Sequence, residues 1–128
     1  VGRLRAIQWS AQANRRCADC VERGPTYICL NFSTFVCQGC GGVHRELGHR
    51  VKGIAMSQWS EAEVAQLEKG GNERATRAWL AKWSKDEMPE PDGSKVEEVR
   101  EFIRLKYTEK RWFRWQPEAE DPQPAGAP

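Results

Sequence analysis

Hydrophobic and polar positions divide the chain into a first part of short segments and a second part of helices. Near the start, Leu4 and its apolar neighbours share one face of a short helix predicted over residues 1–13. Residues 26–30 and 34–37 are rich in β-branched and aromatic side chains, which predicts two short strands. Residues 50–56 alternate less regularly and predict a third strand. The first part is therefore expected to build a small sheet.

Helix start signals mark the second part of the chain. Ser60 and Glu63 have the spacing of a capping box, and Trp59 stands where it can pack on Val64 as a hydrophobic staple. A helix is therefore predicted directly after Ser60. A shorter helix is predicted over 41–47, after the last of the paired cysteines.

Two further helices are predicted downstream. Asn72 can cap a helix that runs through Trp83, and Ser94 with Glu97 forms a second capping box. The helix opened by that second box should bury one face, made of Val96, Val99, Ile103 and Tyr107.

Composition predicts one domain over residues 1–116 and a disordered tail over 117–128, which lacks aromatic and β-branched side chains. Hydrophobic residues make up 39% of the chain, and so lean a core often needs a metal or disulfides. The net charge of +2 excludes a polybasic protein. No apolar run is long enough to predict a membrane span. The chain opens at Val1 without a methionine, and we expect it to be part of a longer protein.

The cysteines carry the strongest chemical signal. Four of them form two Cys-x-x-Cys pairs separated by 16 residues: Cys17, Cys20, Cys37 and Cys40. Two intervening residues let both thiolates of a pair face one ion, and the second pair completes a tetrahedral shell of sulfur. This arrangement predicts one structural Zn²⁺ ion with no open position for water or substrate.

Disulfides and an iron–sulfur cluster are the alternatives for the paired cysteines. Disulfides are disfavoured because no secretory signal is visible, and two pairs at this spacing favour a metal over a redox site. The fifth cysteine, Cys29, lies within a predicted strand and is expected to be a buried free thiol.

Among other zinc proteins, a deaminase is excluded and a nucleic-acid-binding finger stays only as a weaker alternative. Residues 44–46 imitate the His-x-Glu motif of zinc deaminases, but in those enzymes the Cys-x-x-Cys pair follows the motif and the metal keeps a water. A DNA-binding finger would carry a basic helix after the second cysteine pair. This segment offers only Arg45, Arg50 and Lys52, so no nucleic-acid partner is expected.

The motif Cys-x2-Cys-x16-Cys-x2-Cys-x4-Arg, which ends at Arg45, resembles the zinc finger of the Arf-GAP domain, the GTPase-activating module for ADP-ribosylation factors. The resemblance covers residues 4–115. Within the family, residues 24–60 look most like the branch with plant and nucleoporin-like Arf-GAP proteins. Further segments that resemble the family are "NRRCADC" at 14–20, "GPTY" at 24–27, Asn31, "FVC" at 35–37, "GGVHRELG" at 41–48, Trp59, "GN" at 71–72 and "KYTEKRW" at 106–112.

The resemblance implies an α+β fold: a small three-stranded antiparallel sheet with a four-cysteine zinc finger, surrounded by about five helices. It implies a domain that stimulates GTP hydrolysis in trans and has no complete active site of its own. Arg45 would be the arginine finger, because guanidinium stays protonated and can neutralise charge on phosphates. The alternative role for Arg45 is a structural ion pair with a carboxylate such as Asp19.

Other residues are expected to support this activity. His44 should lie beside the zinc site, hydrogen-bonded to a thiolate or a backbone carbonyl. His49, flanked by a glycine and an arginine, is expected to be exposed. A partner-binding surface is expected from Trp59, Ile54, Arg50 and Lys52.

The implied partner is a GTP-bound Arf-family GTPase. The domain is expected to be monomeric and to act in the cytoplasm in membrane trafficking. Peripheral association with Golgi or endosomal membranes is left open. The sequence departs from the family at Ser33, where many members carry glycine, and at Ser57, where aspartate is common. These departures keep a second function open: a catalytically weak, zinc-dependent module that binds Arf or adaptor proteins.

Overall fold

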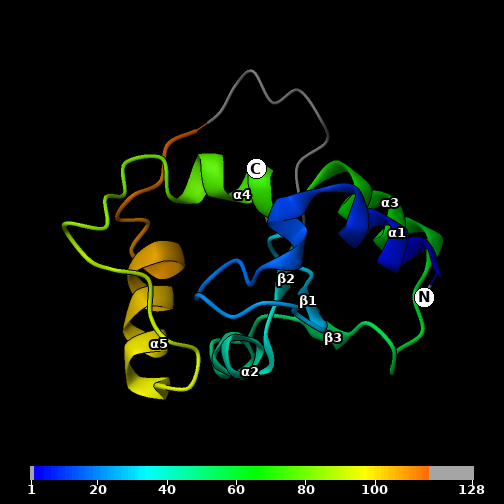
Figure 1. Cartoon of the computed structure of the whole chain (residues 1–128), viewed down its shortest axis with the longest axis horizontal. Coiled ribbons are helices and arrows are strands. Elements are labelled where there is room, and N and C mark those ends of the chain that lie inside the picture. Colours follow the sequence, from blue (N-terminus) through cyan, green and yellow to red (C-terminus); the bar gives the residue numbers. More distant parts are fainter. Residues whose placement is uncertain (1, 116–128) are drawn as a thin grey trace.

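The computed structural model describes residues 2–115, which form an α+β fold (Figure 1). The predicted fold class is confirmed: this part of the chain holds a three-stranded antiparallel sheet and five α-helices. The predicted tail at 117–128 lies outside the described residues. In chain order the elements are α1 (Gly2–Ser10), the 3-10 helix η1 (Gln12–Arg15), β1 (Tyr27–Cys29), β2 (Thr34–Val36), α2 (Gln38–Glu46), β3 (Val51–Gly53), α3 (Glu61–Lys69), α4 (Asn72–Trp79), α5 (Val96–Ile103) and the π-helical η2 (Arg104–Thr108).

The sheet has the strand order β2-β1-β3, and both pairs are antiparallel. Ile28 in the central strand pairs with Phe35 on one side and Lys52 on the other. All three predicted strands are present, but each is shorter than its pattern indicated. β2, for example, stops at Val36 because Cys37 already acts as the N-cap of α2.

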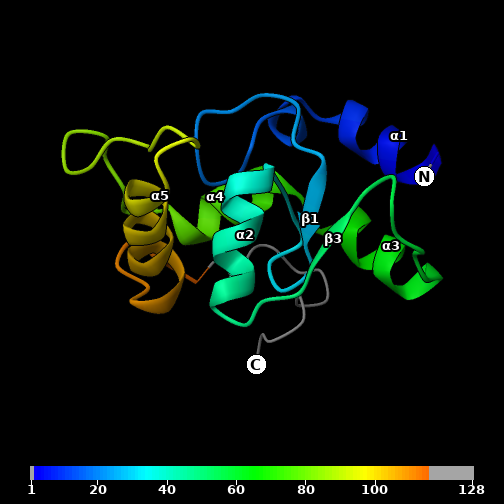
Figure 2. The same ribbon diagram turned by 90° about the horizontal axis from the view of Figure 1, so that it is seen from below.

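Both faces of the sheet are buried, which explains why its strands lack a clean alternation of apolar and polar residues. Ile28 and Phe35 face an apolar cluster formed with α1 and α3. The next residues, Cys29 and Val36, point to the opposite face and pack in a cluster formed with α2 and α5. The two helix pairs lie on opposite sides of the sheet in Figures 1 and 2. The cysteine-rich side of the molecule therefore packs directly against one face of the sheet.

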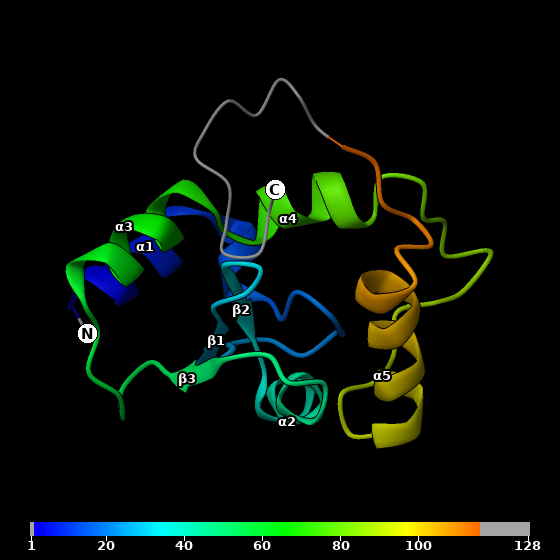
Figure 3. The ribbon, with the colours of Figure 1, turned by 180° about the vertical axis from the view of Figure 1, so that it is seen from behind.

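The C-terminal part of the described chain packs where the end of α4 meets α5. After η2 the chain returns toward the end of α4 (Figure 3). There the amide N–H of Lys82 donates to the carbonyl of Trp112 at 3.0 Å. Leu80, Phe102 and Trp112 form a third apolar cluster at this junction. Not one of the described helices is long and apolar enough to cross a membrane.

The capping box before α3 is confirmed. The Ser60 hydroxyl accepts from the Glu63 amide N–H at 3.1 Å, and the Glu63 carboxylate accepts from the Ser60 amide N–H at 3.0 Å. Trp59 packs against the cluster that contains Val64, as the staple predicts.

The other two predicted caps are wrong. Gly71, with a φ of +98°, precedes α4, and the Asn72 side chain instead joins β2 to the loop after η1. Its Oδ1 accepts from the Phe35 amide N–H at 2.7 Å, and its Nδ2 donates to the Arg16 carbonyl at 2.7 Å. The Ser94 hydroxyl donates to Asp92 Oδ1 at 2.8 Å and makes no cap, so α5 begins at Val96 without a side-chain cap.

Several predicted boundaries also shift. The first helix ends at Ser10 and a separate 3-10 turn follows it, and α4 ends at Trp79, before the predicted Trp83. α2 begins at Gln38, because the Cys37 sulfur accepts from the backbone one turn on and starts the helix early. On α5, Val96 is 46% exposed and Phe102 is buried in its place.

Candidate functional site

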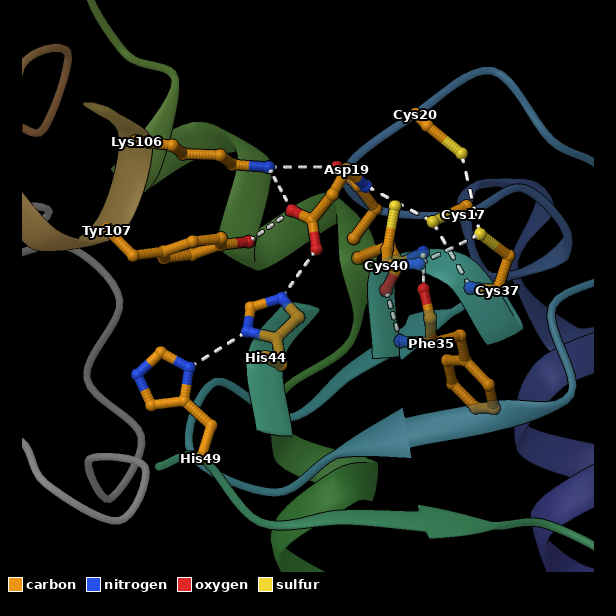
Figure 4. Close-up of polar contacts among 12 residues, drawn as sticks. Cys17, Asp19, Cys20, Phe35, Cys37, Cys40, His44, His49, Lys106 and Tyr107 are labelled. Atoms are coloured by element: carbon orange, nitrogen blue, oxygen red, sulfur yellow. Dashed lines mark hydrogen bonds and ion pairs between the residues drawn. The ribbon is translucent and has the colours of Figure 1, made fainter. Parts of the chain in front are cut away.

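The four paired cysteines lie together at the start of α2. Their Sγ atoms all lie within 4.8 Å of one another, and each side chain is free of disulfides. Cys20 Sγ and Cys37 Sγ are 3.6 Å apart (Figure 4). A tetrahedral zinc site with Zn–S bonds of about 2.3 Å would separate its sulfurs by about 3.8 Å. The donor set and its spacing therefore fit one Zn²⁺ ion.

Backbone amides surround the sulfurs, as expected for two knuckle turns. The first knuckle is formed by residues 17–20 and the second by residues 37–40. Cys17 Sγ accepts from the N–H of Asp19 at 3.4 Å and from that of Cys37 at 3.2 Å. Cys37 Sγ accepts from the Cys40 N–H at 3.4 Å. Hydrogen bonding to Cys17, and then to the other cysteines, raises the pKa of Cys40. A cation among the sulfurs would allow all four to ionise together.

Gly93 contacts the cluster from the loop before α5, a role that the sequence analysis missed. A Cβ atom at this position would lie 2.9 Å from both Cys20 Sγ and Glu22 Cγ. Any larger residue would push against the first knuckle, so glycine lets the two segments approach each other closely. No motif around Gly93 indicates this contact, because the residues it meets lie about seventy positions earlier in the chain.

Asp19, between the first two cysteines, is the centre of a buried polar network. Its Oδ1 accepts from Lys106 Nζ at 2.8 Å and from the Tyr107 hydroxyl at 2.6 Å, and its Oδ2 lies 2.8 Å from His44 Nε2 (Figure 4). All four side chains are at least 96% buried. Lys106 also donates to the Ala18 carbonyl at 2.8 Å. The network fastens the first knuckle to α2 and η2.

Opposite charges set the ionisation of this network. Burial by itself would raise the pKa of Asp19, but Lys106 and then His44 lower it well below its ordinary value. Burial likewise works against a charged imidazole, yet the Asp19 carboxylate raises the pKa of His44 to about 9. The expected hydrogen bond from His44 to a thiolate of the cluster or a carbonyl is replaced by these contacts with Asp19 and His49.

Arg45 follows His44 on α2 and is exposed, in contrast to the buried residues of the network. Its Nη2 donates to the Val51 carbonyl at 3.1 Å, and its guanidinium carbon lies 5.6 Å from the centre of the Tyr27 ring. The alternative ion pair with Asp19 is not formed, because that carboxylate is buried with other partners. The guanidinium of Arg45 thus rests against β1 and β3, while the residue stays exposed.

The four residues predicted to bind a partner are only partly on the surface. Ile54 is a correction: its side chain is fully buried in the cluster beneath α1 and α3 and offers nothing to a partner. Trp59 is half-buried and donates its indole N–H to the Ile54 carbonyl at 3.3 Å. Lys52 lies 4.5 Å from the centre of the Trp59 ring and 3.0 Å from a Glu63 oxygen. Arg50 contacts Glu63 at 3.4 Å and is largely exposed.

Comparison with known proteins assigns the fold and the cysteine cluster to one family. A family model described as "Putative GTPase activating protein for Arf" matches residues 3–116. The chain belongs to the ArfGap family.

Individual relatives agree with this assignment. The chain is 46% identical over 99 residues to "Probable ADP-ribosylation factor GTPase-activating protein AGD14" of Arabidopsis thaliana, a match that covers 77% of this chain and 15% of that protein. It is 40% identical over 102 residues to the human "Arf-GAP domain and FG repeat-containing protein 1", covering 78% of this chain and 18% of that protein. The ArfGap chain thus spans less than a fifth of these curated relatives.

Solved structures of ArfGap domains share the fold of this chain. The "ArfGap domain of HIV-1 Rev binding protein" superposes with a TM-score of 0.83 and 36% sequence identity, covering 94% of this chain and 91% of that chain. The predicted resemblance to the plant and nucleoporin-like branch of the ArfGap family is therefore confirmed.

Proposed function

We propose that this ArfGap domain accelerates GTP hydrolysis by an Arf-family GTPase and that Arg45 acts as its arginine finger. The observation that supports the proposal is the state of Arg45. Within residues 2–115 its only polar contact is a backbone carbonyl, so its charge is not neutralised by a carboxylate. A charge held in this way can be shared with the phosphates of a bound partner.

The reaction needs positive charge in the right place more than it needs new covalent chemistry. Negative charge is spread over the transferred phosphoryl group in the transition state, and an arginine supplied in trans raises the rate by roughly 10³ to 10⁵. The guanidinium suits this role because it stays protonated and offers a planar fork of donors to phosphate oxygens.

Placement of the finger follows from the fold. A misplacement of about 1 Å can cost roughly a hundredfold in rate, so the base of the finger must be rigid. α2 starts at the cysteine cluster, and Asp19 holds His44 in the turn directly before Arg45. When bound to Cys17, Cys20, Cys37 and Cys40, Zn²⁺ would crosslink the two knuckles and leave no position for substrate. The residues of the chain then supply the charge, and the metal site supplies the rigidity.

The partner surface would surround the finger. Arg50 and Lys52 lie on or beside β3, next to the carbonyl that holds Arg45, and the Trp59 ring lies against Lys52. We expect the domain to meet its GTP-bound partner as a monomer in the cytoplasm. It would also bind peripherally to Golgi or endosomal membranes.

The test is single-turnover GTP hydrolysis by Arf bound to liposomes. The wild-type domain should accelerate hydrolysis, and Arg45→Ala should lose most of a gain of roughly 10³ to 10⁵. Arg77→Ala, which removes an exposed arginine on α4, is the matched control and should keep full activity. Equal activity of wild type and Arg45→Ala would refute the finger. Binding of GTP-loaded Arf by the wild type without acceleration would instead identify a non-catalytic interaction module.

A further inference from the structure

A second group of soft metal ligands adjoins the buried Asp19 network and shares His44 with it. The Sγ atom of Cys29 and a ring nitrogen each from His44 and His49 all lie within 4.8 Å of one another. The three residues come from the end of β1, from α2 and from the loop after α2. We propose that Cys29, His44 and His49 form a second metal site, which binds a thiophilic divalent cation such as Zn²⁺.

The distance between the two histidine nitrogens is close to the one that a cation would impose. His44 Nδ1 and His49 Nδ1 are 2.9 Å apart and face each other (Figure 4). In a tetrahedral zinc site with Zn–N bonds of about 2.0–2.1 Å and a Zn–S bond of about 2.3 Å, neighbouring ligand atoms lie about 3.3–3.6 Å apart. The two nitrogens would therefore separate by only about 0.4 Å. The half-buried His49 ring can supply this movement, while His44 stays held by Asp19.

The chemistry of the donors also favours this class of cation. One thiolate and two imidazoles are ligands that suit Zn²⁺ and exclude the oxygen-seeking Ca²⁺ and Mg²⁺. On binding, the cation takes the place of the proton between the two Nδ1 atoms, and that proton leaves to solvent with the proton of the Cys29 thiol. Three protein ligands leave a fourth position for water or for a group from a partner.

The histidine at the centre is already oriented as a metal ligand. His44 Nε2 lies 2.8 Å from Asp19 Oδ2, which is the carboxylate–histidine contact that fixes the tautomer of metal-ligating imidazoles. Asp19 is itself held by Lys106 and Tyr107, so the imidazole cannot turn away. This arrangement leaves Nδ1 as the nitrogen that faces His49.

The surroundings allow entry and limit hydration. Cys29 and His44 have no exposed surface, whereas His49 is half-buried and borders solvent. The Phe32 ring stands edge-on to His49, with ring centres 5.0 Å apart, and also lies beside His44. An ion would enter past His49 and then clamp β1, α2 and the loop after α2 together.

The test counts metal ions in the whole chain. After equilibration with buffered excess Zn²⁺ and removal of free ion, mass spectrometry should find two zinc ions per wild-type chain and one in His49→Ala. Arg50→Gln, at the neighbouring exposed position, is the matched control and should keep two. One ion in the wild type, or two in His49→Ala, would overturn the proposal. Both results are independent of GTPase activation, so the site can fail while the proposed function stands.

Cobalt gives a second readout that identifies the ligand. When Co²⁺ replaces zinc, Cys29→Ser should weaken the thiolate-to-metal charge-transfer absorption, because one of the five thiolates on the metals is lost. His49→Ala should do the same without changing a fully buried residue, so the readout survives if Cys29→Ser fails to fold. Spectra of His49→Ala and wild type that coincide at saturating Co²⁺ would show that the three side chains form only a hydrogen-bonded group.

Discussion

The buried ion pair between Lys106 and Asp19 links the two ends of the domain, and its removal should be strongly destabilising. Lys106 is 1% exposed and lies 87 positions from Asp19 in the chain. The substitution Lys106→Met keeps most of the volume of the side chain and removes its charge. It leaves the carboxylate without its ammonium partner and the Ala18 carbonyl without its donor.

The expected loss follows from what remains around the carboxylate. Removing one partner of a buried ion pair typically costs about 3–5 kcal/mol. Asp19 keeps the Tyr107 hydroxyl at 2.6 Å and His44 at 2.8 Å, so the cost should fall near the lower end, about 3 kcal/mol. In a domain of this size one kcal/mol shifts the Tm by roughly 4 °C, which gives a Tm about 12 °C lower.

Thermal and urea unfolding followed by circular dichroism, at equal zinc content, would measure this loss. Lys69→Met, at an exposed position on α3, is the matched control and should stay within about 0.5 kcal/mol of wild type. In a double-mutant cycle, Asp19→Asn with Lys106→Met should lose at least about 1 kcal/mol less than the sum of the single losses. Additive losses, or a Lys106→Met protein that melts with the control, would refute the reasoning.

Two further outcomes concern the cysteine cluster. Chelation of zinc, or Cys37→Ser, should abolish the cooperative melt followed by circular dichroism, because the binding energy of a structural zinc site is folding energy; a cooperative melt without zinc would contradict this role. Gly93→Ala should speed zinc release to a chelator, because the new Cβ would meet Cys20 Sγ at 2.9 Å. Gly42→Ala, whose Cβ meets nothing within 4 Å, should release zinc at the wild-type rate, and equal rates for both variants would dismiss the contact.

Features that depend on neighbours in the chain could be predicted from the sequence. The cysteine pairs need only two intervening residues to face one ion, and their sulfurs do gather. The Ser60–Glu63 box closes across one turn of helix, and it forms as predicted. The strands also appear, because β-branched and aromatic residues favour extended backbone. Together with the family resemblance, these local signals were enough for the fold class.

The predicted helix caps that proved wrong involve polar side chains with more than one available hydrogen-bond partner. Asn72 has the composition of a helix cap, but it bonds to segments 37 and 56 positions away. Ser94 has the spacing of a capping box, yet Asp92, two residues before it, takes its hydroxyl. A side-chain donor binds the acceptor that packing brings nearest, and a motif cannot show which acceptor that will be.

Burial and long-range pairing were decided by the tertiary structure alone. The pattern around Ile54 suits a surface strand as well as a core strand, and only the packing of α1 and α3 over the sheet buries it. Nothing local pairs Asp19 with Lys106, or Cys29 with His44 and His49. Short-range patterns were enough to predict the cysteine pairs, the helix start at Ser60 and the family. The fold decided which charges meet, because their free energy depends on an interior that exists only after the chain has closed.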